Sequence, residues 1–319
     1  MTTLPAQPGF AGRLLAVASD IKLSHSVFAL PFAVLALFLA AAAPAPGSVS
    51  GNTLPGWEQV ALIVLCMILA RTVAMAVNRW ADAALDAQNP RTAQRAIPAG
   101  RVPAPFMLNV AIFCALGFIA ATGGFWVLYD NFWPVALSPV VLVYLAGYSW
   151  TKRVTWLCHL YLGVALALSP IAATIAIQPA VLGSPAGVPI WLLSVMVATW
   201  VAGFDVLYAL QDVAVDRAQG LWSVPSRLGV ARALWIARGL HLAAATALAG
   251  VALTSDRLGL AFALAAGATV ALLAVEHLIV ALGGTRRVPL VFLTINGFIS
   301  LLLGAAGVFD VTMSLRLAA

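Results

Sequence analysis

The residues best suited to chemistry lie directly after an apolar run that is long enough to span a membrane. Asn78, Asp82 and Asp86 are spaced four residues apart, and on a helix such residues stay within roughly 80° of one face. Hard oxygen ligands in a column suit Mg²⁺, which completes its shell with phosphate oxygens. Arg91 and Arg95 follow at once, and guanidinium groups suit the same phosphates. The alternative interpretation is a solvated polar turn between two helices.

A second acidic stretch closes another apolar run. Four of its residues share one helical stripe at positions i, i+3, i+7 and i+11: Asp205, Tyr208, Asp212 and Asp216. The chain has only eleven Asp and Glu residues, so random placement would not concentrate them in two short columns. Facing columns would hold Mg²⁺ ions between them and a diphosphate across the metals. Divalent ions would also cancel the repulsion that raises the pKa of clustered carboxylates.

Basic and aromatic residues elsewhere could reach the same site. Tyr148 and Lys152 are four residues apart, so Lys152 can extend toward a phosphate or, equally, toward lipid headgroups, as we expect of Arg153. Arg71 lies inside an apolar run, where a charge is a functional candidate because its insertion is costly. A structural ion pair is its alternative role. Lys22 could meet an acidic substrate or only contribute to topology.

The composition places these residues in a membrane protein. Of 319 residues, 63% are hydrophobic and 9% are charged, whereas soluble domains carry about 25% charged residues. Nine apolar runs, each near the ~20 residues that a bilayer requires, predict spans at about 27–43, 58–77, 106–128, 132–150, 158–178, 189–210, 231–254, 258–282 and 289–308. We therefore predict an all-α integral membrane protein, with nine transmembrane helices around a central cavity and a single domain over residues 1–319.

The distribution of basic residues predicts the orientation. Alternating the connections places thirteen Lys and Arg residues on one side and two on the other, and basic loops face the cytoplasm. The N-terminus is then cytoplasmic, the C-terminus is outside, and both acidic stretches form a cytoplasmic Asp-rich mouth in the inner or plasma membrane. Because topology explains most of the net charge of +6, we exclude nucleic acid as a partner.

Three motifs together resemble the UbiA superfamily of intramembrane aromatic prenyltransferases. Residues 78–95, Asn-x3-Asp-x3-Asp followed by Pro-Arg-Thr-x2-Arg, are similar to the first Asp-rich motif of that family. Residues 205–216, Asp-x2-Tyr-x3-Asp-x3-Asp, resemble the second, and residues 148–152 resemble its Tyr-x3-Lys element. Stretches such as Tyr-Ala-Leu-Gln-Asp at 208–212 look closest to the 4-hydroxybenzoate polyprenyltransferase group, particularly its subset in menaquinone synthesis through the futalosine route.

The resemblance implies Mg²⁺-dependent transfer of a polyprenyl group from a polyprenyl diphosphate to an aromatic acid, of 4-hydroxybenzoate or dihydroxynaphthoate type, in quinone biosynthesis. The cavity would open to the lipid bilayer, and no obligate protein partner is implied. The expected metal ligands are Asn78, Asp82, Asp86, Asp212 and Asp216.

The remaining candidates would bind the substrates. Charge on the leaving group would be met by Arg91, Arg95 and Lys152. Tyr148 and Tyr208 would shield an allylic carbocation with their ring faces. Asp205 would orient the acceptor or take its ring proton, and Arg71 or Lys22 would meet the acceptor's carboxylate.

Other functions remain open at this point. A transporter also uses intramembrane charge, although its site would lie near the bilayer midplane rather than at helix ends. An alcohol phosphotransferase is disfavoured because no Asp-Gly-x2-Ala-Arg segment is present. Haem farnesylation and chlorophyll synthesis are alternatives within the resembled family. The sequence does not decide the acceptor, the prenyl chain length, the oligomeric state or the residue that takes the ring proton.

Overall fold

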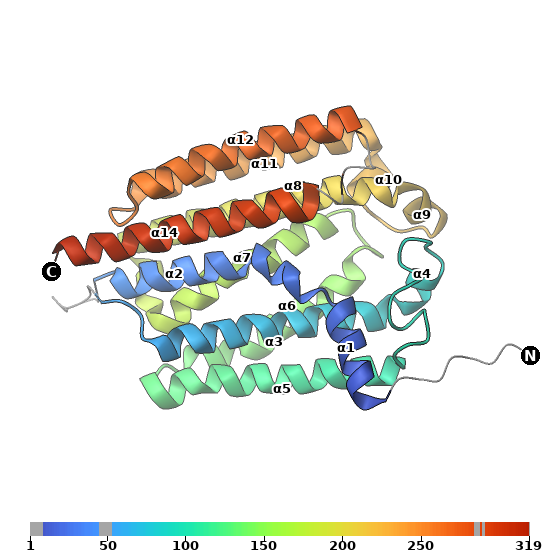
Figure 1. The fold of residues 1–319 in the computed structure, drawn as a ribbon, viewed down its shortest axis with the longest axis horizontal. Coiled ribbons are helices and arrows are strands. Elements are labelled where there is room, and N and C mark those ends of the chain that lie inside the picture. Colours follow the sequence, from blue (N-terminus) through green and yellow to red (C-terminus); the bar gives the residue numbers. More distant parts are fainter. Residues whose placement is uncertain (1–8, 45–52, 284–287, 289–290, 319) are drawn as a thin grey trace, which may run out of the picture.

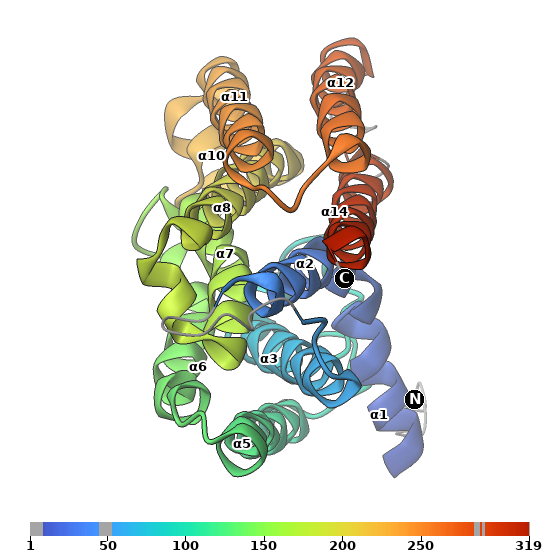
Figure 2. The ribbon, with the colours of Figure 1, turned by 90° about the vertical axis from the view of Figure 1, so that its left-hand side faces the viewer.

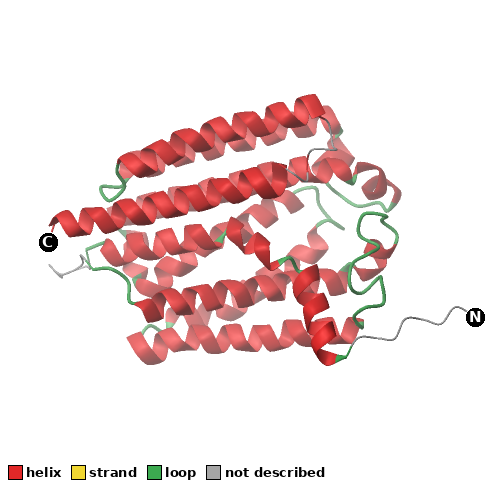
Figure 3. Cartoon of the chain, viewed as in Figure 1, coloured by secondary structure: helices red, strands yellow, loops and turns green. Residues whose placement is uncertain are grey.

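The protein is a bundle of long helices (Figure 1), seen in a computed structural model that describes residues 9–44, 53–283, 288 and 291–318. Within these residues the regular structure is helical, with no strand (Figure 3). Eight helices are long and apolar enough to cross a membrane. They are α3 (Trp57–Ala81), α5 (Ala104–Tyr129), α6 (Trp133–Thr151), α7 (Cys158–Ile177), α8 (Val188–Tyr208), α11 (Val230–Thr254), α12 (Leu260–Gly283) and α14 (Asn296–Ala318). The predicted all-α membrane fold is therefore confirmed.

The count of nine spans is not confirmed, because the first predicted span is a short helix. Residues 27–43 contain the end of a 3₁₀ turn, η1 (Leu23–Phe28), and the 13-residue helix α2 (Leu30–Ala42). At 1.5 Å per residue, α2 measures about 20 Å, less than the ~30 Å of the hydrocarbon core. Helix α2 nevertheless lies in the middle of the bundle, between α7 and α14 (Figure 2).

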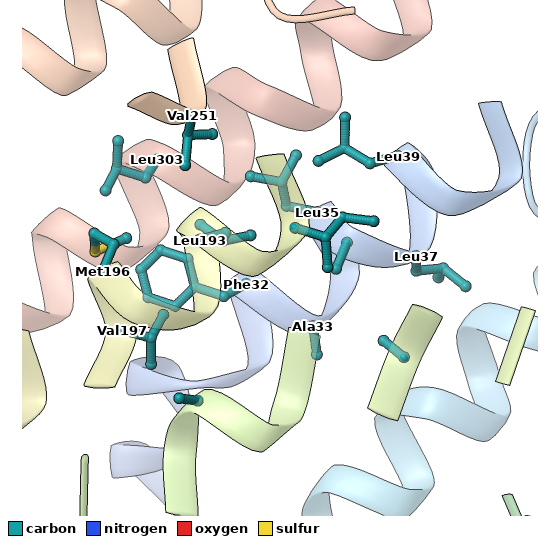
Figure 4. Close-up of a cluster of buried hydrophobic side chains, with 14 of the residues drawn as sticks. Phe32, Ala33, Leu35, Leu37, Leu39, Leu193, Met196, Val197, Val251 and Leu303 are labelled. Carbon is teal, nitrogen blue, oxygen red and sulfur yellow. The ribbon is translucent and has the colours of Figure 1, made fainter. Parts of the chain in front are cut away.

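The core explains why α2 is central. Phe32 and Leu35 of α2 are fully buried and lie among residues of α8, α11 and α14, such as Leu193, Val251 and Leu303 (Figure 4). Small residues let the helices approach closely: a Cβ at Gly163 of α7 would overlap the carbonyl oxygen of Ala198 in α8. The bundle is thus tied together around α2 and α8.

The last span lies further along the chain than predicted. The sequence indicated 289–308, whereas α14 begins at Asn296 after a π-helical turn, Val291–Ile295 (η6), and continues to Ala318. Asp310 lies inside α14, and its carboxylate accepts hydrogen bonds from the backbone N–H groups of Gly259 (2.8 Å) and Phe262 (2.8 Å) at the start of α12. A satisfied aspartate can remain inside a helix bundle. The predicted basic loop residues Arg286 and Arg287 lie outside the described residues.

Short helices gather at one end of the bundle, here named the motif end. Helix α4 (Ala83–Ala87) follows α3, and α9 (Val213–Ala218) follows α8 after the 3₁₀ turn η4 (Ala209–Gln211). Helix α10 (Val224–Leu228) leads into α11, and all three short helices lie at the same end in Figure 1. Helix α1 (Phe10–Asp20) crosses beside α3 near this end.

Candidate functional site

In both acidic motifs one aspartate separates two helical segments, Asp82 between α3 and α4 and Asp212 between η4 and α9. Asp82 ends α3 with φ −97° and ψ 7°, and Asp212 precedes α9 with φ −104° and ψ 4°. Across each break the i to i+4 hydrogen bond survives, from the N–H of Asp86 to the carbonyl of Asp82 (2.8 Å) and from that of Asp216 to Asp212 (2.7 Å). The predicted helical columns are therefore kept in a bent form, with the same spacing in both motifs.

One pocket at the motif end is lined by both columns. Eleven of the thirteen predicted site residues line it: Asn78, Asp82, Asp86, Arg91, Arg95, Tyr148, Lys152, Asp205, Tyr208, Asp212 and Asp216. The exceptions are Arg71 and Lys22. Residues more than 120 positions apart in the chain thus share one cavity, as the prediction of facing columns requires.

Each of the four motif aspartates is paired with a basic side chain. Arg153 meets Asp82 at 2.8 Å, and Arg95 meets Asp86 at 2.7 Å. The remaining pairs are Arg91 with Asp212 at 2.6 Å and Lys152 with Asp216 at 2.8 Å. Three of these four cations, Arg91, Arg95 and Lys152, are those that the sequence predicted to bind phosphate, and each directly contacts an aspartate that was predicted to bind the metal.

Arg91 joins the two motifs. It follows the first motif in the chain, yet its Nε and Nη2 donate to the two carboxylate oxygens of Asp212 at 2.9 and 2.6 Å. Its Nη1 donates to the hydroxyl of Tyr208 at 3.1 Å, and Asn89 donates to Asp212 at 3.3 Å. Such bidentate pairing fixes geometry as well as charge, so the loop after α4 lies across the pocket against the second motif.

Burial and neighbouring charges shift the pKa values of three pocket groups in different directions. Burial alone would raise the pKa of Asp212, but the hydrogen bonds and charge of Arg91 outweigh it and hold that pKa below its ordinary value. Burial raises the pKa of Asp82, and Arg153 offsets only part of the effect. Burial would lower the pKa of Lys152, whereas the neighbouring Asp216 carboxylate raises it on balance.

Arg71 and Lys22 lie outside the pocket lining. Arg71 donates from Nη2 to the carbonyls of Ile21 (3.4 Å) and Lys22 (3.2 Å), so it stabilises the turn after α1. Lys22 has a left-handed backbone with φ 49°. Burial, and after it the charges of nearby arginines that include Arg95, lower the pKa of its ammonium. The predicted contact of either residue with the acceptor carboxylate stays a prediction.

Several pocket residues were missed by sequence reasoning. Arg153 was assigned to lipid headgroups, yet it pairs with Asp82 and also donates to the carbonyl of Ala81 at 2.7 Å. Its position directly after Lys152 was the available signal. His159 was expected to be a packing or hydrogen-bonding residue without a place in the site, whereas it lines the pocket and contacts Asp205. No spacing in the sequence indicated this contact.

A second chain of polar contacts supports the first motif. Asn78 donates to Asp82 at 2.8 Å and accepts from the buried Arg79 at 2.6 Å. Arg79 lies 3.7 Å from the carboxylate of Asp20 at the end of α1, which also accepts from the N–H of Ala96 at 3.1 Å. This chain connects α1 and the loop after α4 to the metal-competent column.

The donor set fits a hard divalent cation. The two columns carry four carboxylates, whose oxygens are ligands that Mg²⁺ prefers, and Asn78 adds an amide whose oxygen accepts here from Arg79. Across the described ranges no three acidic, histidine or cysteine side chains already converge as a metal site, because each motif carboxylate faces a basic group instead. A phosphate-bearing substrate would offer those basic groups a new partner and release the carboxylates.

The pocket thus combines two Asp motifs with four basic side chains at one end of a bundle of helices that are long enough to cross a membrane. Residues 29–302 match the UbiA prenyltransferase family, and the chain belongs to that family. This confirms the family indicated by the sequence motifs and, with it, the class of enzyme, a prenyltransferase.

Curated relatives share part of their length with this chain. A 4-hydroxybenzoate octaprenyltransferase from Aliivibrio fischeri is 30% identical over 197 residues, which cover 61% of either protein. One from Saccharophagus degradans is 29% identical over 215 residues, 67% of either protein. The chain thus spans about three fifths of the length of the first of these relatives.

Solved structures share the fold over nearly the whole chain. A UbiA homologue from Aeropyrum pernix K1, in its apo form, aligns with a TM-score of 0.76 and 26% identity, covering 91% of this chain and 98% of that one. A UbiA homologue from Archaeoglobus fulgidus bound to DMAPP and Mg²⁺ aligns with a TM-score of 0.70 and 16% identity, covering 93% and 99%. The second likeness concerns the fold alone.

Proposed function

We propose that this protein transfers a polyprenyl group from a polyprenyl diphosphate to an aromatic acid, in a reaction that depends on Mg²⁺. The observation that carries the proposal is the single pocket shared by both Asp motifs and four basic side chains. Relatives named 4-hydroxybenzoate octaprenyltransferases and a homologue bound to DMAPP and Mg²⁺ support it. The acceptor would be of 4-hydroxybenzoate or dihydroxynaphthoate type, in quinone biosynthesis, including the menaquinone route.

The metal would be held by the two columns. Its expected ligands are Asn78, Asp82, Asp86, Asp212 and Asp216. When bound, Mg²⁺ would neutralise the diphosphate and favour its departure.

The basic residues would act on the same diphosphate from the other side. Arg91, Arg95 and Lys152 now hold carboxylates, and they would exchange these for phosphate oxygens as substrate binds. Charge that develops on the leaving group would then meet donors already in place, which is commonly the largest contribution to such catalysis. Tyr148 and Tyr208, which line the pocket, would shield the allylic cation with their ring faces.

The acceptor would approach from the deeper side of the pocket. Asp205 lies two helical turns before Asp212 in α8, so it can face the ring while the motif aspartates face the diphosphate. The ring carbon next to a hydroxyl would attack the allylic carbon. The charge asymmetry of the loops supports placing the motif end at the cytoplasmic face, with the C-terminus outside.

A product assay tests this function. Purified protein in lipid would be incubated with prenyl diphosphates of several lengths and with 4-hydroxybenzoate, dihydroxynaphthoates or haem, and products identified by mass. We expect a prenylated aromatic acid that disappears with EDTA and returns with added Mg²⁺. Asp82→Asn should abolish it, whereas Asp256→Asn, at an exposed loop between α11 and α12, should not. Prenylated haem, or transfer that survives EDTA, would refute the proposal.

A further inference from the structure

The deeper wall of the pocket holds a carboxylate–imidazole pair that diphosphate binding does not use. The Nδ1 of His159 in α7 lies 2.7 Å from Oδ2 of Asp205 in α8. Both residues line the pocket, and His159 is 3% exposed. The imidazole is thus buried with both ring nitrogens in contact with polar groups, whereas the Asp205 side chain is 18% exposed.

The surroundings of His159 fix its tautomer. The backbone N–H of Val224 donates to Nε2 at 3.2 Å. Val224 is the first residue of α10, and the first N–H groups of a helix have no partner within it. A nitrogen that accepts a hydrogen bond carries no proton, so the proton of the neutral ring is on Nδ1 and is donated to Asp205.

Asp205 therefore differs from the four motif aspartates. Those four are paired with arginine or lysine, whereas the side-chain partner of Asp205 is the imidazole of His159. A carboxylate held in one orientation by a single ring N–H keeps its other oxygen available to accept a proton. Asp205 lies in α8, seven residues before Asp212 and separated from it by the 3₁₀ turn η4, where the acceptor ring rather than the diphosphate would lie.

We infer that His159 is a positioning residue that holds Asp205 for removal of the ring proton, an inference that rests on the proposed function. The carbon–oxygen bond of the diphosphate breaks, its electron pair leaves with the diphosphate, and a π electron pair of the ring then forms the bond from the ring carbon to the allylic cation. The ring carbon then releases its proton to a carboxylate oxygen of Asp205, and the C–H electron pair restores the aromatic ring. His159 gains no proton, because its Nε2 is occupied by Val224.

Two isosteric variants separate the two hydrogen bonds of His159. His159→Asn places an amide N–H near the position of Nδ1 and keeps the bond to Asp205, but it loses the bond from Val224. His159→Gln places its amide near Nε2 and can keep the bond from Val224, but it loses the bond to Asp205. Each variant loses one hydrogen bond, so a purely structural role predicts similar effects on both.

The experiment measures kcat and KM for both substrates, with thermal unfolding of each variant. We expect His159→Gln to lower kcat about 10- to 100-fold, the size of one hydrogen bond to a charged group, with the KM for the prenyl diphosphate unchanged. His159→Asn should keep most of kcat, and His159→Gln should add little to the loss caused by Asp205→Asn. Equal losses in the Asn and Gln variants, or wild-type kcat in His159→Gln, would overturn the inference. If the wild type forms no prenylated aromatic product, the proposed function fails and this inference fails with it.

Discussion

The two acidic motifs have the same backbone geometry but different partners. In each, an aspartate with φ near −100° ends a run of helix, and the next aspartate is the fourth residue of a short helix. The cations, however, are distributed unequally. Arg91 and Arg95 both come from the loop after the first motif, and Arg91 crosses to the second.

This difference indicates that the two similar motifs have different roles. The loop after the second motif contributes Ser223, whose hydroxyl donates to Asp216 at 2.7 Å and whose backbone starts α10. Ser223 thus adds a hydrogen bond and a helix cap to the second motif, not a basic side chain. The loop after the first motif therefore supplies two groups that can move to a phosphate, of which Arg91 is held by Asp212 of the second motif and Arg95 by Asp86 of the first.

Replacing one carboxylate in each motif is the strongest test of their equivalence. We expect Asp82→Asn and Asp212→Asn each to reduce prenyl transfer by about 100-fold or more, because each removes a charged ligand from a site of concentrated charge. Rates of product formation at saturating Mg²⁺ would measure it, with Asp256→Asn as the control. Near wild-type rates in either variant would show that the metal is held elsewhere.

Arg91 tests the asymmetry between the motifs. Arg91→Gln should weaken binding of a prenyl diphosphate analogue about tenfold. The same change should tighten binding of Mn²⁺ alone, because Asp212 would no longer be occupied by a guanidinium. Mn²⁺ titration by electron paramagnetic resonance, with and without diphosphate, separates the two effects.

The matched control for that experiment is Arg101→Gln. Arg101 lies in the same connection between α4 and α5 but donates to the carbonyl of Gln94 at 2.7 Å rather than to a motif carboxylate. Arg101→Gln should change neither the affinity for the prenyl diphosphate analogue nor the affinity for Mn²⁺. If Arg91→Gln weakened diphosphate binding and left the affinity for Mn²⁺ unchanged, Arg91 would be a phosphate ligand only, without the exchange inferred from its contact with Asp212.

Asn78 and Tyr208, each four residues before a metal-ligand aspartate, should matter less than the aspartates. Asn78 is tied both to Asp82 and to the buried Arg79, whereas the Tyr208 hydroxyl accepts from Arg91. We expect Asn78→Ala to lower transfer about tenfold and Tyr208→Phe about threefold, since the latter removes one neutral acceptor and leaves the ring. Initial rates at fixed substrate would measure this order. A larger loss in Tyr208→Phe than in Asn78→Ala would mean that Tyr208 contributes more to prenyl transfer than Asn78.

The sequence predicted most of this site because its signals are local. Helical spacing places Asp82 and Asp86 on one face whether or not the helix bends between them, and the same holds for Asp212 and Asp216. Apolar runs predicted seven of the eight long helices within about four residues at each end, whereas α14 lies further along the chain than its predicted run. The sequence predicted α2 as a full span, and its short length was missed because its burial depends on α7, α8 and α14 rather than on its own length.

The contacts that were missed depend on tertiary approach. Nothing near His159 in the chain indicates that the N–H of Val224 or the carboxylate of Asp205 will meet it. Arg71 was a functional candidate because inserting a charge into a span is costly. Its guanidinium instead donates hydrogen bonds to two backbone carbonyls directly after α1. Spacing therefore identifies which residues share a face, but it does not identify the partner across the pocket.

The pH dependence of stability gives the smallest expected effect and tests the link between the motifs. The folded pKa of Asp212 lies below its ordinary value of 3.8 because, against burial, Arg91 stabilises the carboxylate. A group with a lowered folded pKa contributes stability above its unfolded pKa, and that stability is lost as pH falls through the folded pKa. The thermal unfolding temperature of the wild type should therefore exceed that of Asp212→Asn near pH 6, and the difference should shrink toward pH 3. Because Arg91 is about one third exposed, water screens part of the interaction, and we expect a shift of only a few degrees. A difference that stays constant over this range would mean that Arg91 and Asp212 do not form a stabilising pair in the folded protein, and the two motifs would then be joined only through the substrate.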